Sequence, residues 1–316
     1  MSEIMIMGEL LVEIMREKED VQLYETGGLF KGPYPSGAPG IFISTAARLG
    51  HSAGIISGVG RDDFGKNILD RLKKVGVDVS RVLESEEAPT GAAFVTYFAN
   101  GDRKFIFHIA HTPAVSAKAP ESLKGLEDVK YFHIMGCSLM ASVNFGNEVV
   151  KTMHMLKSQG TRISFDPNVR LEMLRDASAM DIVKEVYQNT NIFMPGADEL
   201  KMITGQEDLS LAVKRAFEDN EQLELLVLKS GSKGSELYTR NGLEEKMGVY
   251  PVKQMDATGA GDSYDAAFIC GLAEGKTLKE AAKMGAAAGA LNAAAFGPME
   301  GNISRDTVKK MIEENE

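Results

Sequence analysis

A regular alternation of strand and helix patterns is the feature that most restricts how this chain folds. From about residue 125 to residue 230, short runs rich in apolar and β-branched residues take turns with longer segments of helical period. In order, these segments are KYFHIMG, GNEVVKTMHMLKSQG, RISFD, AMDIVKEVYQN, NIFMPG, DELKMITG, LAVKRAF and LELLVLKSG. Strands that alternate with helices are typical of a parallel sheet covered by helices on both faces. The sequence therefore predicts an α/β protein.

Two segments depart from this alternation. Residues 11–34 and 91–109 have strand patterns with no helix of their own, and the second turns at Asn100, Gly101 and Asp102 in the manner of a hairpin. We expect them to form a small β-layer that projects from the α/β body as a lid. No linker or internal repeat divides the chain, so residues 1–316 are expected to form a single domain.

The segment DDFGKNILDRLKKVG predicts a helix with identifiable ends. Asp62 or Asp63 is placed to cap its N-terminus, and Gly76 stands where a glycine commonly follows a helix. The same segment nearly matches the phosphate-binding pattern GxxxxGK. However, two aspartates would face the phosphates and Asn67 replaces the metal-binding hydroxyl, so we favour the capped helix.

The composition argues against several classes of function. The 45 acidic residues outnumber the 35 basic ones and give a net charge of −10, which disfavours nucleic acid and anionic membranes as partners. The two cysteines, Cys137 and Cys270, are far apart in apolar segments, so we expect neither a disulfide framework nor a zinc site. No apolar run approaches the ~20 residues of a membrane-spanning helix. We therefore expect a cytoplasmic protein.

The segment DATGAGD, residues 256–262, is the strongest candidate for a chemical site. Gly259, Ala260 and Gly261 directly precede an apolar helical stretch and leave backbone N–H groups at a helix N-terminus for an anion. Asp262 lies in the first turn, where a carboxylate is a poor phosphate ligand but a suitable proton acceptor. The pattern predicts phosphoryl transfer with Asp262 as the base. The alternative is an ordinary glycine-rich turn with an aspartate that caps the helix.

Four further segments accompany DATGAGD in a fixed order: PSGAPGIFISTAARLG (35–50), SGVGRDDFG (57–65), SFDPNVR (164–170) and LKSGSKGSELY (228–238). Together the five segments resemble the motifs of the ribokinase-like (PfkB) carbohydrate kinase family. SFDPNVR is similar to its 2-keto-3-deoxygluconate, fructose and tagatose kinase branch. The resemblance implies a three-layer α/β/α ribokinase-like fold with a mostly parallel central sheet and a small projecting β-sheet lid. It also implies ATP with Mg²⁺ as phosphoryl donor and a sugar hydroxyl as acceptor.

The resemblance further implies roles for individual residues. It makes Asp262 the catalytic base and places the amides of Gly259, Ala260 and Gly261 in the anion hole. On the nucleotide side it assigns Lys229, Gly231 and Gly234 to the triphosphate, and Asn292 and Gly297 to the adenine pocket. On the acceptor side it implies sugar contacts from Glu13, Gly37, Ala38, Arg103, Phe107, Asp166, Asn168 and Arg170. For Lys229 and Glu13, a solvated charge on a strand is the alternative.

Three positions differ from the family pattern. Ile41 replaces a substrate-binding Asn, and Gly196 replaces the Asn of the segment that organises Mg²⁺, which leaves Glu199 as the metal-site residue. Ile109 stands where 2-keto-3-deoxygluconate kinases tend to have an Arg for the substrate carboxylate, and this favours a neutral ketohexose of fructose or tagatose type. The expected function is an ATP-dependent ketohexose kinase. A 2-keto-3-deoxygluconate kinase and a non-catalytic sugar- or nucleotide-binding protein are the alternatives.

Three points stay open. A monovalent cation such as K⁺ would rest on backbone carbonyls near Asp256 and Gly297. The alternation in AAFVTYF gives one apolar strand face, which belongs either to the inside of the lid or to a homodimer formed through the lid. His108 and His111 are candidates for sugar contacts or, alternatively, for packing or surface positions.

Overall fold

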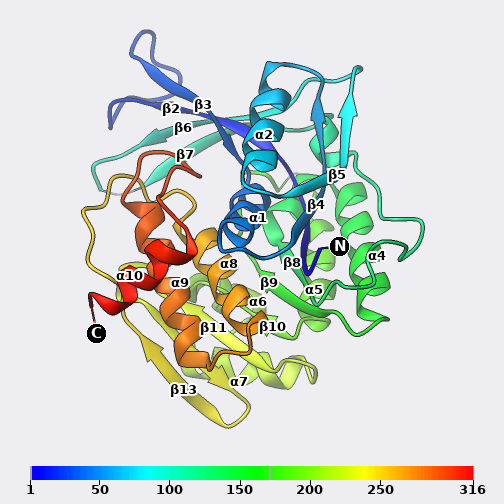
Figure 1. The fold of residues 1–316 in the computed structure, drawn as a ribbon, viewed down its shortest axis with the longest axis vertical. Helices are drawn as coiled ribbons and strands as arrows, with labels where there is room; N and C mark the ends of the chain where they lie inside the picture. Colours follow the sequence, from blue (N-terminus) through cyan, green and yellow to red (C-terminus); the bar gives the residue numbers. More distant parts are fainter. Residues whose placement is uncertain (1, 101, 171, 175, 316) are drawn as a thin grey trace.

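The computed structural model describes residues 2–100, 102–170, 172–174 and 176–315 (Figure 1). Their main feature is a nine-stranded sheet. From one edge to the other it contains β13 (Gly242–Met247), β12 (Ser235–Thr239), β11 (Leu225–Lys229), β10 (Ile192–Phe193), β9 (Arg162–Asp166), β8 (Tyr131–Met135), β1 (Ile4–Met7), β4 (Ala53–Gly60) and β5 (Asp78–Ser85). Neighbouring strands are parallel except where β12 pairs with β11 and with β13. The predicted mostly parallel sheet is confirmed.

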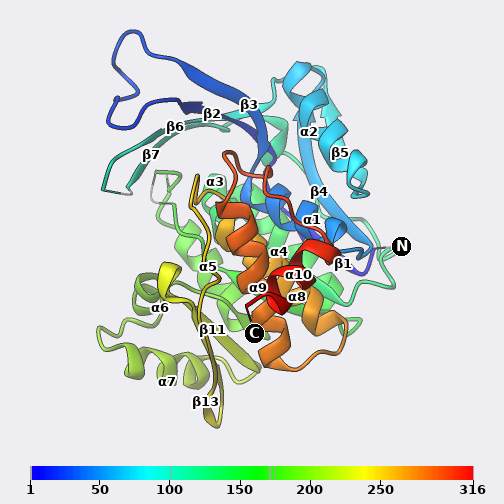
Figure 2. The same ribbon diagram turned by 60° about the vertical axis from the view of Figure 1, so that its left-hand side comes forward.

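The connections between strands place helices on both faces of this sheet. The chain leaves β1, forms α1 (Ala38–Arg48) and returns as β4, whereas it leaves β8, forms α4 (Val143–Lys157) and returns as β9 on the other side of β1. Because parallel crossovers are right-handed, these opposite directions put α1 and α4 on opposite faces. Figures 1 and 2 show α8 (Ala260–Ala273) beside α1, and α9 (Leu278–Ala293) beside α8. The predicted three-layer arrangement is therefore confirmed.

The remaining helices complete the two outer layers. They are α2 (Asp63–Lys74), α3 (Gly136–Ala141), α5 (Ala179–Gln188), α6 (Ala197–Thr204), α7 (Leu209–Asp219) and α10 (Arg305–Glu313), with short 3-10 helices at η1 (Pro113–Val115) and η2 (Gly231–Lys233). The central strands β1, β4 and β8 are buried along their whole length. Such continuous apolar runs are what a parallel sheet covered on both faces requires.

A second, smaller sheet stands off one end of the central sheet and forms the lid. Its order is β3 (Phe30–Ser36), β2 (Leu11–Arg16), β6 (Gly91–Tyr97) and β7 (Arg103–His108). Strands β2 and β6 are parallel, and the other two pairs are antiparallel. Figure 2 shows this sheet in blue and teal, projecting from the body. The predicted segment 11–34 forms strand only near its two ends, since turns and loops occupy residues 17–29.

The structure defines the ends of the predicted helix α2 and the position of the predicted hairpin. Asp62, rather than Asp63, caps α2, because its side chain accepts a hydrogen bond of 2.8 Å from the backbone N–H of Gly65. Gly76 follows the helix with a φ of 92°, a left-handed conformation that suits glycine. The expected hairpin lies between β6 and β7, although its Gly101 lies outside the described residues.

The structure also bears on the cysteines and on membrane-spanning helices. Cys137 and Cys270 are buried free thiols. In the part of the chain that the structure describes, no helix combines the length and apolar character needed to cross a bilayer.

Candidate active site

A cavity lies between the lid and the edge of the central sheet at which the parallel strands end. Its volume is about 300 Å³, and residues that follow β1, β9 and β11 contribute to its wall. This is the edge where open α/β sheets bind ligands. The predicted site residues that line the cavity are Glu13, Gly37, Ala38, Arg103, Phe107, Asp166, Asn168, Arg170, Glu199, Lys229, Gly231, Gly259, Gly261 and Asp262.

The glycine loop before α8 forms one wall of this cavity. Gly259 is the N-cap of α8 and has a φ of 80°; a Cβ there would lie 2.6 Å from the carbonyl oxygen of Pro298. Gly261 faces open space. Ala260 does not line the cavity, and its N–H donates to the carbonyl of Ala257 at 3.3 Å. In this structure a turn bond therefore occupies the amide of Ala260, and the assignment of all three amides to the anion stays a prediction.

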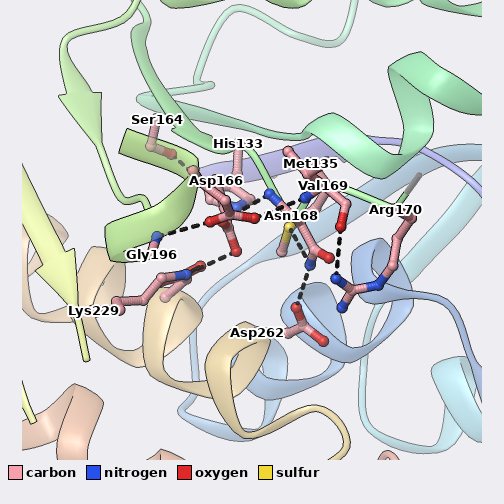
Figure 3. A network of polar contacts seen from close by, with 12 residues as sticks. His133, Met135, Ser164, Asp166, Asn168, Val169, Arg170, Gly196, Lys229 and Asp262 are labelled. Atoms are coloured by element: carbon pink, nitrogen blue, oxygen red, sulfur yellow. Dashed lines mark hydrogen bonds and ion pairs between the residues drawn. The ribbon is translucent and has the colours of Figure 1, made fainter. Parts of the chain in front are cut away.

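Asp262, in the first turn of α8, is buried at the cavity wall. Its Oδ1 accepts a hydrogen bond of 3.1 Å from the side-chain amide of Asn168 (Figure 3). Burial, and then the negative charge of Asp166, raise the pKa of Asp262 to about 7, against the smaller opposing effects of Lys229 and two arginines. A carboxyl group with a pKa near neutrality can take a proton from an alcohol and release it again.

Lys229, at the end of β11, is held between two buried carboxylates. Its Nζ lies 2.8 Å from Oδ2 of Asp166 and 2.8 Å from Oδ2 of Asp265. Burial alone would lower the pKa of Lys229, but these two carboxylates raise it above its usual value. The lysine is therefore not the solvated charge of the alternative interpretation. It lines the cavity, and its assignment to the triphosphate stays a prediction.

The turn after β9 carries the motif residues Asp166, Asn168 and Arg170 into the cavity. Burial raises the pKa of Asp166, but the charge of Lys229 and the hydrogen bonds with Asp265 and Lys229 together outweigh burial and lower this pKa overall. Oδ1 of Asp166 accepts from the backbone N–H of Asn168 at 3.1 Å, and Asn168 has a φ of 37°. This left-handed conformation is one that Asn tolerates better than most residues. The turn thus directs the amide of Asn168 at Asp262.

Glu13 lies on β2, which is an inner strand of the lid, and its side chain is buried. Oε1 accepts a 2.6 Å hydrogen bond from the hydroxyl of Ser36, whereas Oε2 is buried without a partner among the described residues. Burial raises the pKa of Glu13 to about 7, with smaller contributions from Asp256 and Asp262. The alternative of a solvated strand charge is excluded. An unpartnered buried oxygen on a cavity wall is suited to a hydroxyl donor from a ligand.

Other acceptor-side residues come from the lid and from the start of α1. Arg103 and Phe107 lie on β7, and Arg103 donates from Nη1 to the hydroxyl of Thr258 at 3.2 Å. Gly37 has a φ of 96°, and a Cβ at this position would lie 2.5 Å from the carbonyl oxygen of Glu9. Only glycine fits there without strain.

Glu199, the predicted metal-site residue, lies in the first turn of α6. Its Oε2 accepts from the N–H of Gly196 at 2.7 Å and its Oε1 from the N–H of Val169 at 2.8 Å. Burial, and then Asp166, raise its pKa. Within the described residues, no group of three His, Cys, Asp or Glu side chains is arranged to hold a metal ion. The magnesium role of Glu199 stays a prediction.

Three of the predicted nucleotide residues lie away from the cavity. Asn292 is buried behind the glycine loop and donates from Nδ2 to the carbonyl of Thr258 at 2.7 Å. The N–H of Gly297 donates to Oδ2 of Asp256 at 3.1 Å. Gly234 packs tightly against the backbone of Met247. Their assignment to the nucleotide stays a prediction, and the visible role of Asn292 and Gly297 is to hold the loop.

The positions that differ from the family pattern have different surroundings. Ile41 lines the cavity, as expected for a residue that replaces a sugar contact. Ile109 is buried against Gly91 and does not line the cavity, so its side chain gives little information about the substrate. His108 and His111 are exposed and are not part of the lining.

Sequence reasoning missed several residues of the site. Glu9 and Cys137 line the cavity, and the buried Glu9 carboxylate accepts hydrogen bonds from Ser138 and Cys137. The signal for Glu9 was a charged residue inside the apolar run IMIMGELLVEI. Asp265 occupies the turn of α8 after Asp262 and was visible only as a further carboxylate in an apolar helix. Its pairing with Lys229 has no local signal.

Comparison with known proteins shows which family this chain resembles. The model of the pfkB family carbohydrate kinases matches residues 6–305. Among curated proteins, the chain is 32% identical over 300 residues to a probable fructokinase-5 of Arabidopsis thaliana, which covers 90% of this chain and 89% of that protein. It is 29% identical over 303 residues to the 2-dehydro-3-deoxygluconokinase of Bacillus subtilis (strain 168), covering 91% and 90% respectively.

Solved structures show the same architecture. An E. coli protein provisionally named ribokinase II, crystallised with ATP and Mg²⁺, has a TM-score of 0.91 and 36% identity, and the match covers 99% of this chain and 100% of that chain. A fructokinase from Xylella fastidiosa with bound ATP has a TM-score of 0.87 at 18% identity, with 100% and 99% covered, which shows the shared fold alone.

The fold and the site therefore define a ribokinase-like kinase: a three-layer α/β/α body, a β-lid, and a buried carboxylate at the mouth of a glycine-capped helix. The family model and the Arabidopsis relative both match this chain over most of its length. The chain belongs to the pfkB family of carbohydrate kinases.

Proposed function

We propose that this carbohydrate kinase transfers the γ-phosphoryl group of MgATP to a primary hydroxyl of a ketohexose of fructose or tagatose type. The observation that carries the proposal is the position of Asp262, buried on the cavity wall directly after the glycine loop of α8. A proton acceptor beside an anion-binding helix start is what phosphoryl transfer to an alcohol needs. The similarity to fructokinases supports a ketohexose as the acceptor.

In the proposed reaction, Asp262 accepts the proton of the sugar hydroxyl while the hydroxyl oxygen bonds to the γ-phosphorus. The bond from that phosphorus to the oxygen shared with the β-phosphate breaks, and its electron pair leaves with ADP. The amides of Gly259, Ala260 and Gly261, at the positive end of the α8 dipole, stabilise the charge on the transferred group. The lid covers the cavity and would exclude water, which suppresses hydrolysis of ATP.

Magnesium, when bound, would neutralise negative charge shared by the β- and γ-phosphates. We assign its orientation to Glu199, acting through water, because this carboxylate lines the cavity and two backbone N–H groups fix its position. This donor set fits Mg²⁺, which commonly keeps several waters and takes few protein carboxylates. On the nucleotide side we also keep Lys229 and Gly231, which line the cavity, and Gly234, Asn292 and Gly297 as supporting residues.

A sugar acid is the second candidate for the acceptor. Arg103 and Arg170 both line the cavity, and within the described residues neither forms a salt bridge with a carboxylate. Two such guanidinium groups suit a substrate carboxylate. This observation favours a 2-keto-3-deoxygluconate kinase, and the Bacillus relative has such a name. Ile109, which is buried and does not line the cavity, does not argue against this substrate.

A coupled assay of ADP release with fructose, tagatose and 2-keto-3-deoxygluconate tests the assignment. We expect kcat/KM for a ketohexose to exceed that for the sugar acid by at least about tenfold, a difference of about 1.4 kcal/mol in transition-state binding. The reverse order would assign the sugar acid. Tight ATP binding without turnover of any sugar would instead indicate a non-catalytic binding protein, and a nucleotide-soaked crystal with its terminal phosphorus far from residues 259–262 would overturn the mechanism.

We propose three further properties, each with a simple test. The enzyme works in the cytoplasm, which fractionation of the source cells would show. K⁺ activates it near Asp256 and Gly297, as an exchange of KCl for choline chloride would reveal; a fructokinase structure that contains potassium supports this. The exposed apolar residues Phe30 and Ile106 of the lid support a homodimer through its outer face, which sedimentation would detect.

A further inference from the structure

The lid is hydrogen-bonded directly to the loop that precedes α8. Tyr97, the last residue of β6, places its hydroxyl 3.1 Å from Oδ1 of Asp256 and 3.0 Å from the hydroxyl of Thr258. Arg103, the first residue of β7, donates to the same Thr258 hydroxyl at 3.2 Å. Tyr97 and Arg103 are paired across the two strands. One end of the β6–β7 hairpin therefore contacts the loop at two adjacent points.

The body of the protein holds the other side of this loop. Oδ2 of Asp256 accepts from the N–H of Gly297 at 3.1 Å, and the carbonyl of Thr258 accepts from Nδ2 of Asn292 at 2.7 Å. Asp256 also accepts from the N–H of Thr258 at 2.9 Å, which closes the turn. The loop is thus hydrogen-bonded to the body on one side and to the lid on the other. Thr258 directly precedes Gly259, so any shift of Thr258 is passed to the anion-binding amides.

We propose that Tyr97 is a positioning residue for phosphoryl transfer, which makes the geometry of the anion-binding loop depend on the seated position of the lid. The inference rests on the proposed function, since it concerns the same site. Tyr97 itself does not line the cavity, so it acts through Asp256 and Thr258 rather than by touching a substrate. When a bound sugar keeps the lid closed, the hydroxyl of Tyr97 holds the loop in the conformation that binds the phosphoryl group.

The chemistry of the contact supports this role. Asp256 and Thr258 are both buried, so the hydrogen bonds from the lid do not compete with bulk water. Burial, and then the charge of Asp256, raise the pKa of Tyr97 above its usual value, so its hydroxyl remains a donor across the neutral range. A hydrogen bond to a carboxylate is among the stronger ones in proteins. Replacement of Tyr97 by Phe removes this donor and leaves the ring in place.

The first experiment compares Tyr97→Phe with Tyr24→Phe, a matched control in the lid whose side chain is 80% exposed. We expect kcat of Tyr97→Phe to fall about tenfold while KM for ATP stays within about threefold, and the control to match the wild type. Each assay is run well below the melting temperature of its variant, so that loss of folded protein does not enter. A kcat within twofold of the wild type would overturn the proposal.

The second experiment does not depend on turnover. Hydrogen exchange of the loop 254–262 is measured in the nucleotide-free proteins, and Tyr97→Phe should exchange faster there than the wild type and the control. If the wild type phosphorylates no sugar but exchange rises as expected, the proposed function fails and the coupling stands. Unchanged exchange in the loop would refute the coupling, whatever the enzyme activity.

The third experiment asks whether the lid acts through Thr258. Thr258→Val removes the hydroxyl that Tyr97 and Arg103 share. Because Tyr97 and Thr258 share one contact while Tyr97 also bonds Asp256, the double variant Tyr97→Phe/Thr258→Val should lose less kcat than the product of the two single losses. Losses that multiply would show that Tyr97 and Thr258 act independently, which contradicts the proposed route.

Discussion

The side-chain amide of Asn168 lies 3.1 Å from Oδ1 of Asp262 and donates a hydrogen bond to it. Asn168 belongs to the turn after β9 and Asp262 to the first turn of α8, so two layers of the fold meet at the proposed base. Asn168 is itself held in a left-handed conformation by its bond to Asp166. The carboxylate of Asp262 therefore has a fixed orientation before any substrate enters.

Asp262→Asn should abolish turnover with little effect on nucleotide binding. The amide is of the same size but cannot take the proton of the sugar hydroxyl, so kcat should fall by about 10²–10⁴. Calorimetry with a non-hydrolysable ATP analogue should give a Kd within a few-fold of the wild type, because the glycine amides that would hold the phosphate are unchanged. A comparable loss of binding and turnover would mean that Asp262 is structural.

The activity should decrease on the acid side of neutrality. The pKa of Asp262 is raised to about 7, so its basic form dominates above this pH and is lost as the pH falls through it. We expect log kcat/KM to decline with a slope near one below about pH 7. Glu13 has a similarly raised pKa of about 7, so Glu13→Gln is the control. If the decrease below pH 7 disappears in that variant, protonation of Glu13 rather than of Asp262 causes it.

Two replacements of Asn168 separate its hydrogen bond from its backbone conformation. Asn168→Ala and Asn168→Gly both remove the amide that orients Asp262, so both should lower kcat to a similar extent, by about tenfold. Alanine is strained at the φ of 37° and glycine is not. The unfolding free energy of Asn168→Ala should therefore be about 1 kcal/mol lower than that of Asn168→Gly. Chemical denaturation and steady-state kinetics check the two parts. Full kcat in the glycine variant would contradict the orienting role.

Removal of the shared cation at Lys229 should destabilise the protein strongly. Lys229→Met leaves Asp166 and Asp265 buried without their partner, a loss of about 3–5 kcal/mol of unfolding free energy. Lys246→Met is the matched control, because Lys246 pairs with Glu236 with 65% of its side chain exposed. Such a surface pair contributes less than about 1 kcal/mol. Equal effects of the two substitutions would argue against a tight buried network.

Alanine at the two glycines of the anion loop should have different effects. Gly259→Ala combines a φ of 80° with a clash against the carbonyl of Pro298, and should lower the unfolding free energy by about 2 kcal/mol or more. Gly261→Ala meets no atom within 4 Å, so it should leave stability within about 0.5 kcal/mol. Its methyl group would enter the cavity and raise KM for ATP. Thermal melts and ATP titrations measure both effects.

Much of the fold followed from local patterns. The alternation of strands and helices predicted the parallel sheet, and the isolated strands at 11–34 and 91–109 predicted the lid, although residues 17–29 turned out to be loop. Asp62 and Gly76 marked the ends of α2 correctly. These features depend on neighbours within a few residues, so one sequence is enough to find them.

The site was predicted less completely. Asp262 and the cavity-lining glycines Gly259 and Gly261 stand in one short segment, where the helix start and the acid are adjacent in sequence. The assignments of Lys229 to a triphosphate and of the Ala260 amide to the anion stay predictions. The structure adds that Lys229 is paired with Asp166 and Asp265, and these partners could not be recognised from the local pattern because they lie in other elements.

The sequence by itself determined the α/β class, the helix that begins with glycines and carries an aspartate, and the motifs of a carbohydrate kinase. Only the tertiary structure decided that Asn168 meets Asp262 across 94 residues, that Lys229 meets Asp166 across 63, and that Tyr97 meets Asp256 across 159. The physical reason is one of range. Turns and helix ends are set by bonds between near neighbours, whereas these side-chain pairs depend on strand order and on where a helix packs against the sheet.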